Sequence, residues 1–310
     1  MSKLKAYAEL VRLPNLFTAA ADILAAYWLC TLRLEFSWRL AAMLAASVSF
    51  YAAGIVINDL KDIETDRRER PARPLPSGRV SIGAAKLLAA VLCLVGLVAA
   101  AIIPLGYAPE AGISIFHWPN RSLIVAVALL IAIFIYNCVV KETFLGPPVM
   151  GLCRALNFTL GLSLAELENP DILGQVGPFI AAYWLYITAV THFGRDEAGE
   201  IRKRRLLTGF LGIFFAVVAL GVIISPLSEL DAFAMAIWFI LLVHLTRVTW
   251  HTLRNPSPQR MQYNMKTLIL GTLVWNAVIA AAATRDWIAG ALLLALLIPT
   301  LAIGRRIYST

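Results

Sequence analysis

The stretch from Asn58 to Val80 reads N-D-L-K-D-I-E-T-D-R-R-E-R-P-A-R-P-L-P-S-G-R-V and directly follows a long apolar segment. On a helix, Asn58, Asp62 and Asp66 are four residues apart, so each side chain is rotated by only about 40° from the last and the three form a stripe about 12 Å long. Side-chain oxygens are the ligands that Mg²⁺ prefers. The stretch therefore predicts a magnesium site with these three residues as ligands.

Arginines follow the acidic stripe at once, at positions 67, 68, 70 and 73. A site that combines a divalent cation, carboxylates and guanidinium groups suits a diphosphate, because the cations neutralise the phosphate oxygens. The alternative interpretation is a solvated, charged loop between two membrane helices, and the acids alone fit it equally well. The regular four-residue spacing of oxygen ligands favours the binding site.

The composition is that of an integral membrane protein. Of the 310 residues, 60% are hydrophobic and only 15% are charged, and the mean hydropathy is +0.75. Apolar runs of about the length that crosses a bilayer recur along the chain. They predict an all-α, polytopic helical membrane protein with nine to ten spans, organised as a single domain over 1–310. The ten candidates are 14–31, 40–58, 82–104, 122–140, 147–165, 175–193, 206–225, 231–250, 266–284 and 286–303.

Positive charge is distributed very unequally between the two sides of the predicted membrane protein. With ten spans, 22 of the 27 Lys and Arg residues fall on the side that holds the N-terminus. Because cytoplasmic loops carry the excess of Lys and Arg, this predicts both termini and the acidic stripe on the cytoplasmic side of a cell inner (plasma) membrane. The net charge of +8 is then a topological signal. It needs no nucleic-acid partner, and no nucleic-acid-binding motif is present.

A second charged segment follows the sixth predicted span. His192, Asp196 and Glu200 are again four residues apart, and Lys203, Arg204 and Arg205 come shortly after them. Two such stripes on the same membrane face would together hold Mg²⁺ and one diphosphate. Incidental acids among positive-inside residues are the alternative for the second segment alone.

These motifs resemble the UbiA superfamily of intramembrane prenyltransferases. The superfamily's first motif, N-D-x-x-D-x-x-x-D, is complete from Asn58 to Asp66 and continues into R-P-L-P-S-G at 73–78. Its second motif follows the sixth helix; here Asp196 and Glu200 hold the acidic positions, and His192 stands where a tyrosine is common. The second motif therefore departs from the usual pattern.

Further stretches fit the same resemblance. Arg12, Pro14 and Asn15 are similar to the R-x-P-N opening of the first helix, and Tyr136 with Lys141 is similar to a Y-x-x-x-x-K at the end of the fourth. The run at 151–161 resembles the EboC-like branch of the superfamily, whose acceptor is not settled. The superfamily usually has nine spans, so of the last two apolar runs either both are helices or one lies at the interface.

The resemblance implies a helical bundle around a central cavity and Mg²⁺-dependent transfer of an isoprenyl group from a prenyl diphosphate to a lipophilic, aromatic acceptor. A terpene cyclase of the same fold and a non-catalytic isoprenoid carrier are the alternatives. Mg²⁺ between the stripes would stabilise the departing diphosphate, with Asp59 supporting the first stripe. The predicted metal ligands are Asn58, Asp62, Asp66, Asp196 and Glu200; the catalytic residues are Asp62, Asp66, Asp196, Glu200 and His192; the diphosphate contacts are Arg67, Arg70, Arg73, Lys141, Lys203 and Arg204.

Several polar residues fall deep within predicted spans. Asp22 and Arg154 would each cost about 2.5 to 3.5 kcal/mol at the bilayer centre, so they are expected to pair or to face a wet cavity. Asn157 lies three residues beyond Arg154, on the same helix face. With Asn15, these residues are the predicted cavity lining. His192 is either a base that accepts the proton released on coupling, or an ordinary hydrogen-bonded histidine.

Overall fold

The computed structural model describes residues 3–34, 36–104, 120–164, 170–195, 202–227 and 232–307, which are mainly helical and contain no strand. The elements are α1 (Lys3–Leu10), α2 (Leu13–Thr31), α3 (Trp38–Lys61), α4 (Ile63–Glu69), α5 (Ile82–Ala101), α6 (Arg121–Ile135), the π-helical turn η2 (Tyr136–Val140), α7 (Gly146–Leu162), α8 (Pro170–Gly194), α9 (Lys203–Ile224), α10 (Ala232–Arg254), α11 (Pro258–Thr284), α12 (Trp287–Ala295) and α13 (Leu297–Gly304). The all-α prediction is confirmed.

Within the described ranges, nine helical segments are long and apolar enough to cross a membrane. They match nine of the ten predicted spans. The remaining predicted span, 147–165, corresponds to α7, which is 17 residues long and packs against α2, α6 and α8. Both of the last two apolar runs are helical. The run at 266–284 lies in α11, and the run at 286–303 is formed by α12 and α13, which make one 18-residue segment interrupted only at Leu296.

Side-chain caps mark where several of the long helices begin. The Ser37 hydroxyl accepts a hydrogen bond from the Leu40 amide at 3.2 Å, and Ser81 accepts one from Ala84 at the same distance. Ser257 and Asp286 do the same at the starts of α11 and α12. Each cap satisfies an amide that the first turn of a helix leaves unpaired, which matters most where little water is available.

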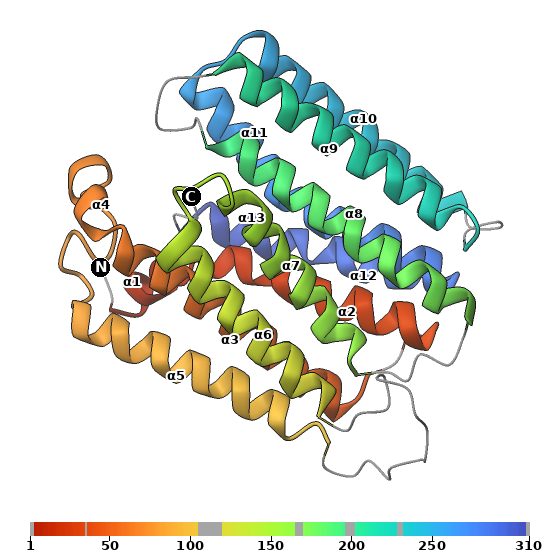
Figure 1. The fold of residues 1–310 in the computed structure, drawn as a ribbon, viewed down its shortest axis with the longest axis horizontal. Coiled ribbons are helices and arrows are strands. Elements are labelled where there is room, and N and C mark those ends of the chain that lie inside the picture. The colour runs from red at the N-terminus through yellow and green to blue at the C-terminus, as the bar shows by residue number, and fades with distance from the viewer. Residues whose placement is uncertain are drawn as a thin grey trace.

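The helices form one bundle in which α2 and α11 lie at the centre (Figure 1). These two helices pack on each other, α2 also contacts α3 and α7, and α11 also contacts α10 and α12. The outer helices α5 and α12–α13 are the least buried of the candidate spans, as expected for helices that face lipid.

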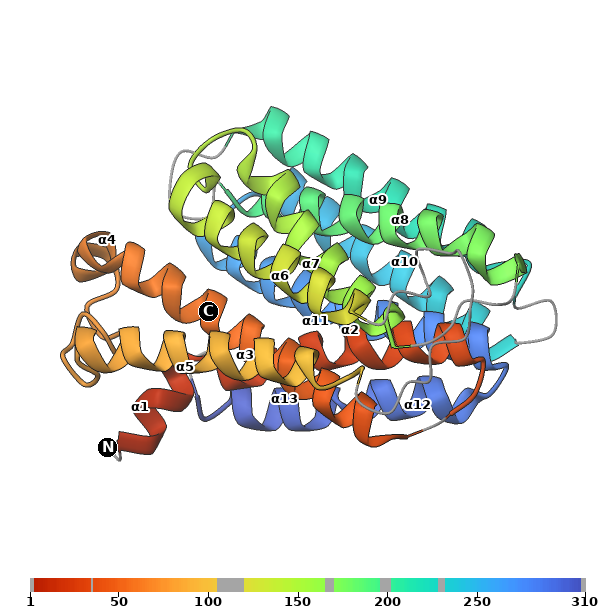
Figure 2. The ribbon, with the colours of Figure 1, turned by 60° about the horizontal axis from the view of Figure 1, so that its bottom comes forward.

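One end of the bundle carries the charged elements. The short helix α4 projects beyond the apolar bundle there, and α1 lies at the same end (Figure 2). Gly304, the last residue of α13, lies near Pro14 at the start of α2, so α13 also ends there. We call this the α4 end. Its basic residues are those assigned above to the cytoplasm, and the orientation in a membrane stays a prediction.

Candidate active site

The acidic stripe spans the junction of α3 and α4. The helix breaks at Asp62, which has φ −86° and ψ 4°. The backbone nevertheless keeps helical hydrogen bonds from Asp62 N to Asn58 O at 2.9 Å and from Asp66 N to Asp62 O at 2.8 Å. The predicted four-residue periodicity is therefore retained across two helices.

Asp62 is the most accessible acid of the stripe and contacts two donors. Its Oδ2 atom accepts a hydrogen bond from Asn58 Nδ2 at 3.1 Å and forms an ion pair with Lys141 Nζ. Lys141 follows η2, so its ammonium reaches the stripe from another helix. Sequence spacing placed Asn58 and Asp62 on one face; the structure adds the predicted lysine to them.

Asp66, the last residue of the stripe, and Asp59 belong to a buried chain of alternating charges. Asp66 Oδ2 is 2.6 Å from Arg73 Nη1, and that same nitrogen is 3.7 Å from Asp59 Oδ1. Asp59 Oδ1 is also 3.1 Å from Nη2 of Arg12. Asp59 thus contacts arginines on both sides, and the predicted metal ligand Asp66 is held by Arg73; the supporting role of Asp59 stays a prediction.

The remaining predicted diphosphate contacts are distributed around the same end. Arg67 is half exposed and pairs with Glu64 at 2.6 Å, one turn away on α4. Arg70 is partly buried at the end of α4, and Lys203 and Arg204 are exposed in the first turn of α9. Among the residues that the structure describes, no hydrogen bond or ion pair joins these four side chains to Asp62, so their role toward a diphosphate stays a prediction.

The second acidic segment is only partly described. Asp196 and Glu200 lie outside the described residues. His192, in the last turn of α8, is 3.0 Å from the hydroxyl of Thr208 on α9 through its Nε2 atom. Arg195, the last described residue after α8, donates to the backbone carbonyls of Lys141 and Thr143. The end of α8 is therefore joined to the segment that carries Lys141.

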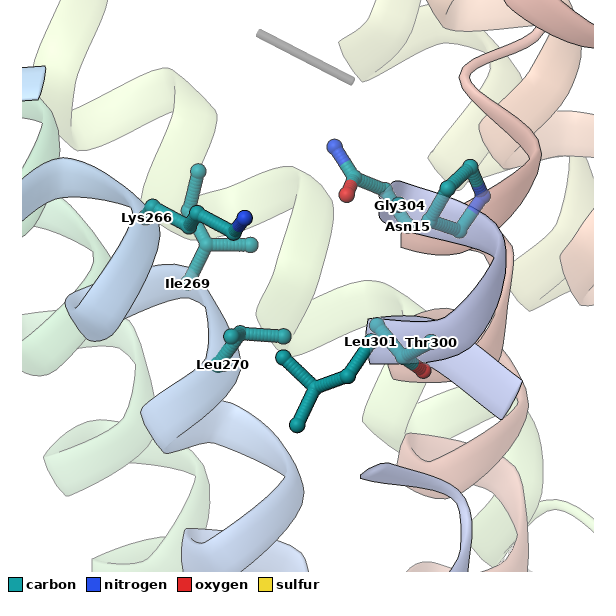
Figure 3. A pocket seen from close by; sticks show the side chains of 8 residues that line it. Asn15, Lys266, Ile269, Leu270, Thr300, Leu301 and Gly304 are labelled. Carbon is teal, nitrogen blue, oxygen red and sulfur yellow. The ribbon is translucent and has the colours of Figure 1, made fainter. Parts of the chain in front are cut away.

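Asn15 lines a small cleft near the α4 end. Figure 3 shows Lys266, Ile269 and Leu270 of α11 facing Thr300, Leu301 and Gly304 of α13 across it, with Pro14 and Asn15 of α2 completing the lining. Its volume of about 20 Å³ is room for about one water molecule. The cleft as it stands is therefore too small for a prenyl chain.

The other predicted cavity residues form a buried polar network in the middle of the bundle. Asp22 is fully buried and pairs with Arg154 at 3.3 Å, which is one of the two arrangements expected from the sequence. It also accepts hydrogen bonds from Tyr183 at 2.6 Å, Asn276 at 2.7 Å and Asn157 at 2.9 Å. The network joins four helices, and in it Asp22, Arg154 and Asn157 contact protein partners. Their lining of a cavity stays a prediction.

Two residues outside the network's centre complete it. Ser47 of α3 donates to Asn157 Oδ1 at 2.7 Å, and the guanidinium carbon of Arg154 lies 5.3 Å from the ring centre of Tyr51 on the same helix. A carboxylate with three hydrogen-bond donors and a guanidinium is well compensated, which is how a buried charge is retained in an apolar bundle.

The donor set at Asp62 suits a hard divalent cation. Asn58 and Asp62 offer amide and carboxylate oxygens, and Asp62 already contacts a positive charge in the Lys141 ammonium. Within the described part of the chain, no three Asp, Glu, His or Cys side chains converge as a metal cluster. The acids of the first stripe instead contact separate cations.

The model of the UbiA prenyltransferase family matches residues 19–270, which include the stripe, Lys141 and the end of α8. The chain belongs to the UbiA prenyltransferase family. Membership in the UbiA family makes it an intramembrane enzyme that transfers prenyl groups. The closer resemblance of 151–161 to the EboC-like branch stays a prediction.

Relatives of the chain within the UbiA family include digeranylgeranylglyceryl phosphate synthases. The one from Sulfurisphaera tokodaii is 26% identical over 290 residues, covering 87% of this chain and 96% of the relative. The one from Methanocaldococcus jannaschii is 43% identical over 100 residues, covering 32% of this chain and 35% of the relative.

Two solved structures of UbiA proteins show the same fold. A digeranylgeranylglyceryl phosphate synthase has a TM-score of 0.64 at 22% identity, covering 92% of this chain and 100% of the other. A UbiA homologue from Archaeoglobus fulgidus, solved with GPP and Mg²⁺, has a TM-score of 0.59 at 16% identity, covering 91% and 100%. The predicted fold class is confirmed.

Sequence reasoning did not assign roles at the site to Arg12 or Arg195. Arg12 was recognised only as part of a motif, although its left-handed backbone (φ 47°, ψ 55°) brings the chain around a corner between α1 and α2. Arg195 looked like one of many positive-inside residues. No spacing rule relates either residue to its partner, because the partners lie 47 and 54 positions away.

Proposed function

We propose that this UbiA protein transfers a prenyl group from a prenyl diphosphate to a hydroxyl group of a lipophilic glycerophosphate, in a reaction that depends on Mg²⁺. The observation that carries the proposal is the contact between Asp62 and Lys141. It brings an oxygen ligand and a cation from separate helices together at the α4 end, where a diphosphate needs both.

The acceptor class is inferred from the relatives, whose names specify a glyceryl phosphate product. The aromatic acceptor expected from sequence has no such support and stays untested. The donor class is supported by the Archaeoglobus homologue, which was solved with GPP.

The chemistry breaks the bond between C1 of the prenyl group and the diphosphate oxygen, and the electron pair leaves with the diphosphate. A new bond then forms between C1 and the acceptor oxygen, which loses its proton. Mg²⁺, held by Asn58 and Asp62, would supply positive charge where the departing diphosphate becomes more anionic. Lys141 would bind the phosphate oxygens, and the apolar bundle would keep water from the allylic carbon.

The test uses the purified full-length protein in lipid vesicles with labelled geranylgeranyl diphosphate. We expect a labelled product with a prenylated glyceryl phosphate as acceptor, loss of that product after chelation of divalent ions, and recovery with Mg²⁺. Asp62→Ala should abolish transfer, whereas Lys86→Gln, at an exposed residue of α5, should not.

The other outcomes separate the alternatives. Transfer only to a hydroxylated aromatic acid would replace the proposed acceptor class. A cyclic hydrocarbon or alcohol formed without any acceptor would identify a cyclase. Saturable prenyl-diphosphate binding with no product under any of these conditions would support a carrier.

A further inference from the structure

Arg195 is the described residue that links the end of α8 to the Lys141 segment. Its Nη2 atom donates to the carbonyl oxygen of Lys141 at 2.6 Å and to the carbonyl oxygen of Thr143. Arg195 also immediately precedes Asp196, the first acid of the second motif. The Arg195 guanidinium therefore connects the start of the second acidic motif to the backbone of Lys141, the residue whose ammonium contacts Asp62 of the first motif.

The carbonyls that Arg195 binds lie where a helix ends. α6 continues into η2, whose last residue is Val140, and Lys141 follows it. Carbonyls at a helix end lack intrahelical partners and carry partial negative charge, so they favour a cation. A π-helical turn is uncommon and occurs frequently at functional sites, since it changes the direction of the residues that follow.

Gly146 leaves the space that the guanidinium occupies. A Cβ atom at this position would overlap Arg195 Nη2 and would lie 2.5 Å from Lys141 O and 3.0 Å from Val140 O. Neither carbonyl belongs to a flexible side chain, so the backbone would have to move. A side chain at position 146 would thus meet both the Arg195 guanidinium and the backbone of the turn, so Gly146 leaves a niche in which Arg195 fits.

Arg195 in this niche is hydrogen-bonded to Lys141, whose side chain enters the site. Arg195 fixes the backbone of Lys141, and the ammonium of that same lysine contacts Asp62. An ordinary positive-inside arginine is solvated and needs neither two carbonyl partners nor a glycine beside it.

We propose that Arg195 is a positioning residue of the diphosphate site, which holds Lys141 against Asp62 and fixes the end of α8 beside it. The inference rests on the proposed function, because it assigns Lys141 to a bound diphosphate. Arg195 acts through Lys141 and does not itself contact the substrate.

A double-mutant cycle on diphosphate affinity tests this role. Thermal unfolding of the purified protein is followed over a range of inorganic diphosphate concentrations at constant Mg²⁺, which gives an apparent dissociation constant without turnover. We expect Arg195→Gln to weaken diphosphate binding about tenfold, with Lys141→Met weakening it at least as much. The double variant should bind no more weakly than Lys141→Met alone, since removing the lysine removes what Arg195 positions.

Three further variants test whether the effect on diphosphate affinity is specific to Arg195 and its niche. Arg195→Lys retains the charge and should recover part of the affinity. Gly146→Ala should weaken diphosphate binding as Arg195→Gln does, and if it fails to fold, the Arg195 and Lys141 cycle decides alone. Lys86→Gln on α5 should leave the affinity unchanged.

Two results would overturn the inference while leaving the proposed function intact. One is additive losses in the double variant, because Arg195 would then contact the phosphates directly. The other is a lower unfolding temperature of Arg195→Gln at unchanged diphosphate affinity, because the residue would then serve stability only. A wild-type protein that shows no response to diphosphate would instead count against the proposed function itself.

Discussion

Arg73 Nη1 lies 2.6 Å from Asp66 Oδ2, and both side chains are more than nine-tenths buried. The arginine belongs to the R-P-L-P-S-G segment, in which Gly78 adopts the left-handed conformation (φ 72°). A motif that sequence reasoning assigned to phosphate binding therefore also neutralises Asp66, an acid of the stripe, and the neighbouring Asp59.

Arg73→Gln should lower the free energy of unfolding by about 3 to 5 kcal/mol, because it leaves two buried carboxylates without their shared guanidinium. Thermal unfolding in detergent measures the loss. Mg²⁺ should raise the unfolding temperature of this variant more than that of the wild type, since a cation can replace the missing charge. Arg68→Gln, an exposed arginine in the same segment, is the matched control and should unfold like the wild type.

The stripe shows which parts of the site follow from sequence. Four-residue spacing correctly placed Asn58 and Asp62 on one face, because backbone hydrogen bonds continue through the α3–α4 junction. The same spacing gave no sign that Asp66 would be held by Arg73, since that pairing depends on how the following turn folds. Local periodicity predicts a helix face but not the loop that covers it.

The sequence predicted that helices span the membrane and that the charge of Asp22 is compensated, but it did not predict which residues lie next to each other. The length of the apolar runs predicted the nine candidate membrane-spanning helices of the described residues. The cost of a charge in lipid predicted that Asp22 would have a partner. Hydropathy carries no information on which helices adjoin, so Asn276, 254 residues away, was not foreseen as another partner of Asp22.

The Asp22 and Arg154 pair predicts an unequal effect of single and double substitutions. Asp22→Asn should destabilise the protein by about 3 to 5 kcal/mol, because Arg154 remains buried without a counter-charge. The double variant Asp22→Leu/Arg154→Met, which removes both charges, should unfold at a higher temperature than Asp22→Asn. If the double variant is the less stable of the two, hydrogen bonds of the network rather than charge compensation dominate its stability.

Gly161 allows α2 and α7 to pack closely against each other. A Cβ atom at this position would lie 2.8 Å from both Ala26 Cβ and Ile23 O of α2. Gly161 is one turn beyond Asn157, so pushing the helices apart also lengthens the hydrogen bond from Asn157 to Asp22.

Gly161→Ala should therefore lower stability by about 1 to 3 kcal/mol, as overpacking does in a tight core. The measurement is thermal unfolding beside Gly83→Ala, whose added methyl group meets no atom within 4 Å. Equal unfolding temperatures for the two variants would contradict close packing of α2 and α7 as the function of this glycine.

Substitution of His192 is expected to affect turnover without affecting the binding of the prenyl diphosphate. The residue stands one turn before Asp196 in sequence, and its Nε2 atom shares a hydrogen bond with Thr208. A histidine accepts protons readily near neutral pH, and coupling to a hydroxyl acceptor releases one. His192→Ala should therefore reduce kcat about 100-fold or more while the affinity for the prenyl diphosphate stays within about twofold.

Single-turnover kinetics with labelled prenyl diphosphate, together with equilibrium binding of the same compound, measure the two quantities separately. Thr208→Val is the matched control, because it removes the hydrogen-bond partner and retains the imidazole. If His192→Ala keeps full turnover, histidine is not the base, and its contact with Thr208 serves only to join α8 to α9. If both turnover and binding fall together, His192 instead shapes the diphosphate site.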